Sequence, residues 1–203
     1  NALLYHLPAL KKLPRAGLVH RLDKATTGLL VVAKTLRAHT SLVAQLQART
    51  IKREYEAIVN GTLTGGGKVV EPMGRHPRNR VKMAIVTSGK FALTHYRIIE
   101  RFSAHTRLKI LLETGRTHQI RVHMAHVYHP VLGDPLYGNQ LFCKGLSSQA
   151  RSALKKIQRQ MLHARRLTLE HPATGEILSW KAPLPQDMVD CLALLKEIDD
   201  ELD

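Results

Sequence analysis

The amino-acid sequence predicts a single α+β domain in which helices flank a mixed, mostly antiparallel sheet. Three observations favour this fold class. The chain has 203 residues, 44% of them hydrophobic, which is enough for one sizeable core. Its strand-like segments follow one another through glycine-containing turns, as in hairpins, and do not alternate regularly with helices. Helical periodicity is limited to a few segments between and after the strands.

The first third of the chain predicts a strand, a helix and a second strand. Residues 1–18 read as irregular because two prolines interrupt them. The apolar segment 29–33 predicts a buried strand, entered through a sharp turn at Gly28. Residues 37–49 form a helix pattern, with apolar side chains on one face. Residues 53–59 alternate as a strand, with three side chains on one side: Tyr55, Ala57 and Val59.

The middle of the chain predicts a basic loop followed by several strands and a short helix. Residues 74–82 have no apolar periodicity and read as the loop. Residues 81–87 and 91–102 are typical of the two arms of a hairpin, and residues 107–114 of a further strand. Thr117 is a good N-cap for a helix that follows it. Strand alternation is also compatible with the apolar residues of that segment, Ile120, Val122 and Met124.

The last third predicts a loop, a basic helix, a hairpin and a terminal helix. We expect the loop over residues 139–150 and the basic helix over residues 151–162. A short strand begins near Leu167, and the turn 171–175 joins it to a return strand. A helix starts near Gln186 and carries its apolar side chains on one face: Met188, Leu192, Leu195 and Ile198.

The charge of the chain is strongly one-sided. Lys and Arg number 31 against 16 Asp and Glu, which gives a formal net charge of +15 and an isoelectric point near 10.2. Such an excess predicts an anionic partner, most directly a nucleic acid. A membrane surface is the alternative. We see no basic amphipathic helix and no apolar run of spanning length, so we expect no membrane contact.

The cysteines and the N-terminal residues favour a cytoplasmic location. Cys143 and Cys191 are the only cysteines, and their spacing is not that of metal ligands. No signal peptide is visible, and so small a number of cysteines suits a reducing compartment better than secretion.

A polar turn at residues 19–28 is the first candidate site. It places Asp23 close to Arg21, directly before the apolar segment expected to form a strand. An arginine nearby favours the ionised carboxylate. Such a carboxylate can be a nucleophile, a general base, a metal ligand or half of a structural ion pair, and the residues alone leave these open.

Residues 115–130 contain four histidines and two arginines and form the second candidate site. A histidine metal centre, as in a metallonuclease, is one reading. No carboxylate lies inside the segment and no metal-binding spacing is present, so we expect no metal. Arg121 borders the apolar positions of the segment and should be half-buried. A half-buried arginine needs a carboxylate partner, for which Asp23 is the candidate.

Tyr55 and the basic loop are the third and fourth candidates. Tyr55 lies on the apolar side of its strand, as either a core residue or a ring that stacks on a base or moves a proton. The basic loop offers four cations, either as a solvated surface or as contacts to phosphates: Arg75, Arg78, Arg80 and Lys82.

Four motifs in order resemble those of the RluA-type pseudouridine synthases. They are His20-Arg21-Leu22-Asp23 followed by Thr26-Thr27-Gly28, then Arg53-Glu54-Tyr55, then Gly115-Arg116-Thr117-His118-Gln119-Ile120-Arg121-Val122-His123, and finally Gly133-Asp134-Pro135. The resemblance runs nearly end to end and implies the pseudouridine synthase catalytic fold. Residues 1–203 would then be a single catalytic domain, without the S4-like RNA-binding domain that often precedes it.

The resemblance also implies roles for individual residues. Asp23 matches the catalytic aspartate of the family, Tyr55 its active-site tyrosine, and Arg121 the arginine that pairs with the aspartate. Substrate-binding roles are implied for Leu167, as an apolar wall of the uridine pocket, and for three residues of the first motif: His20, Arg21 and Thr27. Thr27 stands where many relatives have serine.

The activity implied is the isomerisation of uridines to pseudouridine in large-subunit (23S-type) ribosomal RNA. Because substrate and product have the same atoms, we expect no cofactor. The base must leave its stack before it can be turned. The expected partner is large-subunit rRNA or the pre-50S particle, and we expect a monomer. The alternatives are a non-catalytic RNA-binding or ribosome-assembly module, which would not need Asp23, and a metal-dependent nuclease.

Overall fold

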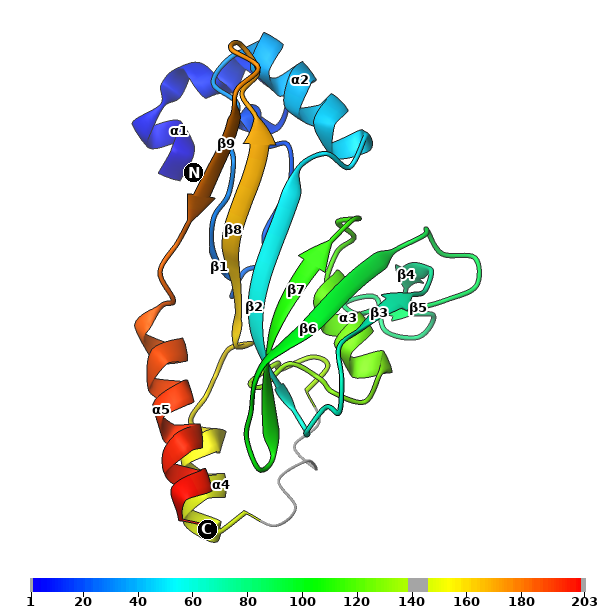
Figure 1. Cartoon of the computed structure of the whole chain (residues 1–203). Coiled ribbons are helices and arrows are strands. Elements are labelled where there is room, and N and C mark those ends of the chain that lie inside the picture. The colour runs from blue at the N-terminus through cyan, green and yellow to red at the C-terminus, as the bar shows by residue number, and fades with distance from the viewer. Residues whose placement is uncertain (1, 139–145, 202–203) are drawn as a thin grey trace.

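The computed structural model describes residues 2–138 and 146–201 and contains one large sheet and one small one (Figure 1). The large sheet has seven strands in the order β1-β8-β2-β7-β6-β3, and β9 also pairs with β8. Only β1 and β8 pair in parallel among these strands. The expected mixed, mostly antiparallel sheet is therefore confirmed. The strands of the large sheet are β1 (Thr27–Gly28), β2 (Lys52–Asn60), β3 (Gly67–Val70), β6 (Leu93–Arg101), β7 (His105–Leu112), β8 (Leu162–Glu170) and β9 (Ile177–Lys181).

Helices pack on both faces and at one end of this sheet (Figure 1). Side chains of β2 alternate between the faces: Tyr55 and Ala57 pack with α3, whereas Ile58 packs with α4 and α5. The helix α2 covers the end of the sheet near Leu167. The helices are α1 (Ala2–His6), α2 (Leu36–Gln47), α3 (Gln119–His126), α4 (Ser148–Lys155) and α5 (Gln186–Asp200).

Several sequence predictions are confirmed with small shifts in their boundaries. The helix expected over 37–49 is α2, the strand expected over 53–59 is β2, and the terminal helix begins at Gln186 as expected. The segment after Thr117 is helical, which decides between the two alternatives. Its N-cap is His118, in the left-handed region at φ 57°, and not Thr117.

The strand predicted over residues 29–33 was wrong. Only Thr27 and Gly28 pair with β8, and a single bridge joins Leu18 to Val32. The reason is that β9 occupies the edge of β8 that β1 would need in order to continue. Beyond Ala164, residues 166–170 of β8 pair with β9. Segment 29–33 therefore runs on toward α2, where Ala33 joins the apolar cluster beneath that helix.

The hairpin predicted between residues 81–87 and 91–102 was also wrong. β5 (Met83–Ile85) pairs with β4 (Met73–Arg75) as a separate two-stranded sheet, and β6 pairs with β7 and β3. Backbone hydrogen bonds in both directions join Lys90 to Met73, at 2.8 and 2.9 Å. The turn at Gly89 therefore leads the chain back to β4 before it enters the large sheet.

Three smaller differences concern turns and helix ends. Residues 2–18 are only partly irregular. Besides α1 they form two 3-10 turns, Pro8–Lys12 and Pro14–Gly17, in which proline occupies the first turn, where a missing N–H costs nothing. Within the second turn, Arg15 and Ala16 have left-handed backbone angles, both with φ of 51°. The basic helix expected over 151–162 is α4, which ends at Lys155. The strand expected near Leu167 already begins at Leu162. The loop expected over 139–150 falls largely outside the described residues, as does Cys143.

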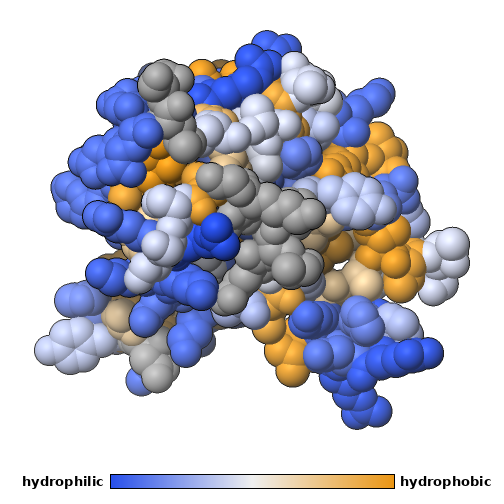
Figure 2. Space-filling model, turned by 90° about the horizontal axis from the view of Figure 1, so that it is seen from below, coloured by the Kyte–Doolittle hydropathy of each residue, from blue (hydrophilic) through white to orange (hydrophobic). Residues whose placement is uncertain are grey.

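Figure 2 shows the molecule from below, relative to Figure 1. On this face most of the described surface is hydrophilic, and hydrophobic residues form separate patches between the hydrophilic ones. Among the helices described, none has the length and apolar character that crossing a bilayer requires.

Candidate active site

A cavity of about 520 Å³ opens between the polar turn, α2, β2 and the start of α3. Asp23 enters it from the turn, Tyr55 from β2, and Arg121 from α3. His118 and Leu162 also line it. The structure thus brings the three residues with implied catalytic roles to one cavity, although they lie far apart in the sequence.

The Asp23 turn is fixed to the start of β8. The backbone N–H of Thr26 donates to the Asp23 carbonyl at 2.9 Å, and Thr27 Oγ1 lies 2.8 Å from His163 Nδ1. Gly28 has φ of 107°, and a Cβ at this position would lie 2.3 Å from the Ala164 carbonyl oxygen. Only glycine therefore allows the turn to approach β8 this closely.

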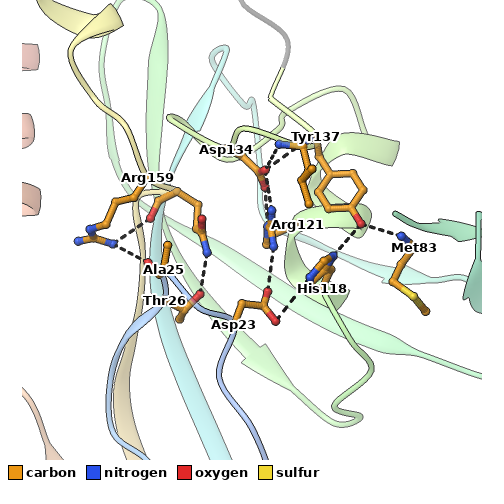
Figure 3. Close-up of polar contacts among 11 residues, drawn as sticks. Asp23, Ala25, Thr26, Met83, His118, Arg121, Asp134, Tyr137 and Arg159 are labelled. Carbon is orange, nitrogen blue, oxygen red and sulfur yellow. Dashed lines mark hydrogen bonds and ion pairs between the residues drawn. The ribbon is translucent and has the colours of Figure 1, made fainter. Parts of the chain in front are cut away.

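Two side chains preceding β8 hold the same turn from the other side (Figure 3). Arg159 donates to the Ala25 carbonyl at 3.3 Å, and Gln160 Nε2 donates to Thr26 Oγ1 at 3.2 Å. Arg159 is itself held by two hydrogen bonds to Asp187 of α5, at 2.5 and 2.6 Å. The backbone that carries Asp23 is therefore anchored by its contacts to residues of the last quarter of the chain.

Arg121 lies between two carboxylates (Figure 3). Its Nη1 donates to Asp23 Oδ2 at 3.2 Å, while Nε and Nη2 donate to the two carboxylate oxygens of Asp134 at 2.7 and 2.8 Å. The side chain of Asp134 is fully buried. Burial alone would lower the pKa of Arg121, but the hydrogen bonds and charges of Asp134 and Asp23 raise it. Arg121 therefore remains a cation beside Asp23.

Asp134 is the residue that the sequence interpretation missed as part of the site. Beyond Arg121, its Oδ1 also accepts the backbone N–H groups of Leu136 and Tyr137, at 2.9 and 3.1 Å. In the sequence, Gly133-Asp134-Pro135 was one of the four family motifs, but its carboxylate was given no role. The signal that points to more is the chemistry of Arg121, because a guanidinium has five N–H donors and one carboxylate cannot satisfy them all.

A chain of polar contacts leads from the small sheet to Asp23 (Figure 3). The backbone N–H of Met83 donates to Tyr137 Oη at 2.8 Å, and Tyr137 Oη lies 2.8 Å from His118 Nδ1. His118 Nε2 is 3.9 Å from Asp23 Oδ1. Burial lowers the pKa of His118, against the opposing charge of Asp23, so the imidazole is neutral at pH 7. A neutral ring that accepts the Tyr137 proton at Nδ1 presents Nε2–H to Asp23.

Tyr55 is 6% exposed and packs its ring in the cluster beneath α3, with one side toward the cavity. Burial raises the pKa of its phenol, the nearby Arg53 opposes this, and Asp23 adds to it. The hydroxyl is therefore protonated at neutral pH.

The other residues of the first motif differ in their surroundings. His20 Nε2 accepts the backbone N–H of Val31 at 3.1 Å, and burial followed by the charges of Arg53 and Arg15 lowers the pKa of His20 to about 4. Arg21 is exposed at the cavity wall and forms no ion pair with Asp23 in the described part of the chain.

Leu167 does not line the cavity, contrary to the role that the resemblance implied. It pairs with Arg53 across the β2–β8 ladder, at the end of β8 that α2 covers, and packs with Leu42 and Ile51. The apolar side chain that β8 contributes to the cavity wall is Leu162, which clusters with Tyr55.

The basic loop lies outside the cavity wall. Arg75 ends β4 and donates from Nη1 to the Arg80 carbonyl at 3.2 Å, and Arg78 and Arg80 are exposed at the turn. Lys82 is half-buried, with Nζ 5.9 Å from the centre of the Tyr137 ring. The loop is thus joined to the site through Tyr137.

Three of the four histidines of residues 115–130 have separate hydrogen-bond partners, and the first, His118, is described above. His123 lies 2.9 Å from Thr94 Oγ1, and His129 lies 2.9 Å from the carbonyl of Asn60. Over residues 2–138 and 146–201, no three His, Cys, Asp or Glu side chains are grouped as metal ligands would be.

Known bacterial proteins are similar to this chain over nearly its whole length. At 57% identity over 198 residues, the chain is similar to "Ribosomal large subunit pseudouridine synthase D" of Pseudomonas aeruginosa, an alignment that covers 97% of this chain and 62% of that protein. It is 55% identical over 208 residues to the protein of the same name from Escherichia coli K12, covering all of this chain and 64% of the relative. The chain thus spans less than two thirds of the length of these curated relatives.

Solved structures agree with this similarity. Human RNA pseudouridylate synthase domain containing 1 superposes with a TM-score of 0.70 at 26% identity, covering 86% of this chain and 72% of the human one. Human RNA pseudouridylate synthase domain containing 4 superposes with a TM-score of 0.71 at 29% identity. This superposition covers 88% of this chain and 75% of the human one. The family model described as "RNA pseudouridylate synthase" matches residues 3–126, which include Asp23, Tyr55 and Arg121. The chain therefore belongs to the RNA pseudouridylate synthase family.

Proposed function

We propose that this chain is the catalytic domain of an enzyme that converts uridine to pseudouridine in large-subunit ribosomal RNA. The observation that carries the proposal is the carboxylate of Asp23. Its side chain is 14% exposed, faces the cavity, and is paired with an arginine that a second, buried carboxylate holds in place. The names of the similar bacterial proteins support the choice of large-subunit RNA as substrate.

The reaction breaks the N1–C1′ bond of uridine and forms a bond between C5 and C1′. The hydrogen on C5 leaves as a proton and N1 gains one, so atoms balance and no redox partner is required. Asp23 acts either as the nucleophile toward the target nucleotide or as the base that removes a ribose proton. Arg121 donates to the carboxylate and keeps it aimed in either role.

Tyr55 is proposed to stack on the uracil and to assist in moving the C5 proton. Its ring lies in the same cavity as Asp23, and its hydroxyl is protonated at neutral pH because burial raises its pKa. His118 faces the second oxygen of Asp23 and is proposed to position it.

RNA binding is proposed to use the polar turn and the basic loop. Arg21 is exposed at the cavity wall, where its side chain can fill the place in the stack that the extruded uridine leaves. His20 and Thr27 shape the turn beside it. The four cations of the basic loop would contact phosphates: Arg75, Arg78, Arg80 and Lys82. The site needs no cofactor, and we propose a cytoplasmic monomer acting on rRNA or on pre-50S particles.

The test is pseudouridine mapping of large-subunit rRNA after incubation with the wild-type chain and with Asp23→Asn. We expect modification at defined uridines by the wild type and none by Asp23→Asn, with equal melting temperatures. Arg166→Gln, which changes an exposed arginine of β8 outside the cavity wall, is the matched control and should retain activity. RNA binding without modification by the wild type would favour the non-catalytic assembly module instead.

A further inference from the structure

The cavity wall carries more positive charge than its carboxylates balance. Two acidic side chains line it, Asp23 and Glu113, against six arginines: Arg15, Arg21, Arg49, Arg53, Arg116 and Arg121. Both acids already have partners. Asp23 is paired with Arg121, and Glu113 lies 2.6 Å from His95 Nε2 and 3.8 Å from Arg49. The remaining arginines must find their counter-charge elsewhere.

Arg53 is the most deeply buried of these remaining arginines. Its residue exposure is 8%, and its Nε is buried without a hydrogen-bond acceptor among the described residues. None of the ion pairs among the described residues includes Arg53. The guanidinium lies tight against Gly115, where a Cβ would come within 2.3 Å of Nη1. The sequence therefore keeps room for this cation, although the described residues supply no carboxylate that pairs with it.

A second unsatisfied donor belongs to His20, which lines the same cavity. His20 Nε2 accepts the Val31 N–H, so the neutral ring carries its proton on Nδ1. That nitrogen is buried and has no acceptor among the described residues. Arg53 and His20 both line this cavity, and burial, to which the charge of Arg53 adds, lowers the pKa of His20 to about 4. Two buried donors without acceptors on one wall indicate a site for an anion.

We propose that Arg53 and His20 bind a phosphate of the RNA chain beside the extruded uridine, a role that rests on the proposed function. Arg53 and Tyr55 are two residues apart on one strand, so their side chains point to the same face at about 6.6 Å spacing. A base stacked on Tyr55 would thus place its own backbone within reach of Arg53. The phosphate satisfies both donors and neutralises the buried cation.

The test compares Arg53→Gln with Arg53→Lys, and with Arg166→Gln as a matched removal of one exposed arginine. Binding to large-subunit rRNA is measured across salt concentrations. Arg53→Gln should reduce the magnitude of the log–log salt slope by about 0.7 to 0.9, the value for one phosphate contact. Arg53→Lys should keep the slope but bind more weakly, because lysine keeps the charge and lacks the fork of the guanidinium. Arg166→Gln should leave the slope unchanged.

Inorganic phosphate, added at constant ionic strength, distinguishes the free ion from the RNA backbone. Phosphate is expected to raise the melting temperature of the wild type. Loss of this rise in Arg53→Gln would show that Arg53 also binds free phosphate. A rise that persists in Arg53→Gln, or an unchanged RNA salt slope in that variant, would overturn the proposal. Because these are binding measurements, they stand even if no pseudouridine is formed, an outcome that would reject the proposed function alone.

Discussion

Arg121 is the residue through which most of the site is held together. One edge of its guanidinium is occupied by Asp134, which leaves Nη1 for Asp23. Asp134 therefore sets the direction from which the cation approaches Asp23. The burial of Arg121 was predictable from its apolar neighbours, and Asp23 was expected as its partner. Asp134 was not expected in the site, because its three-residue motif does not show whether the carboxylate is buried.

The first prediction concerns the ion pair between Arg121 and Asp134. Arg121→Met leaves the fully buried Asp134 carboxylate without a cation and should cost about 3–5 kcal/mol of unfolding free energy. Adding Asp134→Asn to that variant removes the stranded charge and should recover part of this stability. A double-mutant cycle by denaturant unfolding measures the coupling, and strictly additive destabilisation would show that the two side chains do not act as a unit.

The second prediction concerns the hydroxyl of Tyr55. Tyr55→Phe keeps the ring that would stack on the base and removes the group that would move a proton. We expect kcat to fall by about 10²–10⁴ while RNA affinity changes little. Steady-state kinetics on an rRNA fragment, with a binding assay alongside, separates the two effects. Wild-type kcat in this variant would leave the hydroxyl without a chemical role.

Among the elements, the small sheet is the one that local sequence patterns described least well. Its turn residues Ser88 and Gly89 are typical of a hairpin between β5 and β6, which was the expected pairing. They are equally typical of the observed turn, which returns the chain to Met73. Which pairing forms is decided by tertiary contacts, since β6 finds partners on both sides in β7 and β3. By contrast, β2, α2 and α5 were predicted closely because their own periodicity fixes the buried face.

The third prediction belongs to the β4–β5 hairpin and its basic loop. Replacing Arg75, Arg78 and Arg80 by Ala should flatten the log–log salt dependence of RNA binding by about 0.7 to 0.9 for each phosphate that is no longer neutralised. Because Arg75 also donates to the Arg80 carbonyl, the single variant Arg78→Ala is the cleaner measure of one phosphate interaction. An unchanged slope in the triple variant would identify the loop as a solvated surface.

For the whole molecule, buried neutral histidines link stability to pH. Burial lowers the pKa of His105 and of His123 to about 4, from an ordinary value of 6.5. Between these pH values the unfolded chain binds more protons than the folded one, so stability decreases as the pH falls from 6.5 toward 4. Each histidine can contribute on the order of 3 kcal/mol to this decrease.

The fourth prediction follows from that linkage. The free energy of unfolding should decrease steeply between pH 6.5 and pH 4, and His123→Gln should make the decrease shallower. Glutamine retains a donor and an acceptor for the partners of His123, Thr94 Oγ1 and the Glu71 carbonyl. Denaturant unfolding at several pH values gives the two slopes. Parallel curves for wild type and variant would mean that His123 does not titrate differently in the folded state.

The clamp on the Asp23 turn has a consequence for the order of synthesis. Thr27 is translated early, but its partner His163 follows 136 residues later. Arg159 and Gln160, which also hold the turn, are translated only just before His163. A nascent chain that has already emerged as far as Arg121 therefore carries every proposed catalytic side chain while its turn still lacks an anchor. The enzyme would thus become competent late in translation, once β8 has left the ribosomal tunnel and closed against the turn.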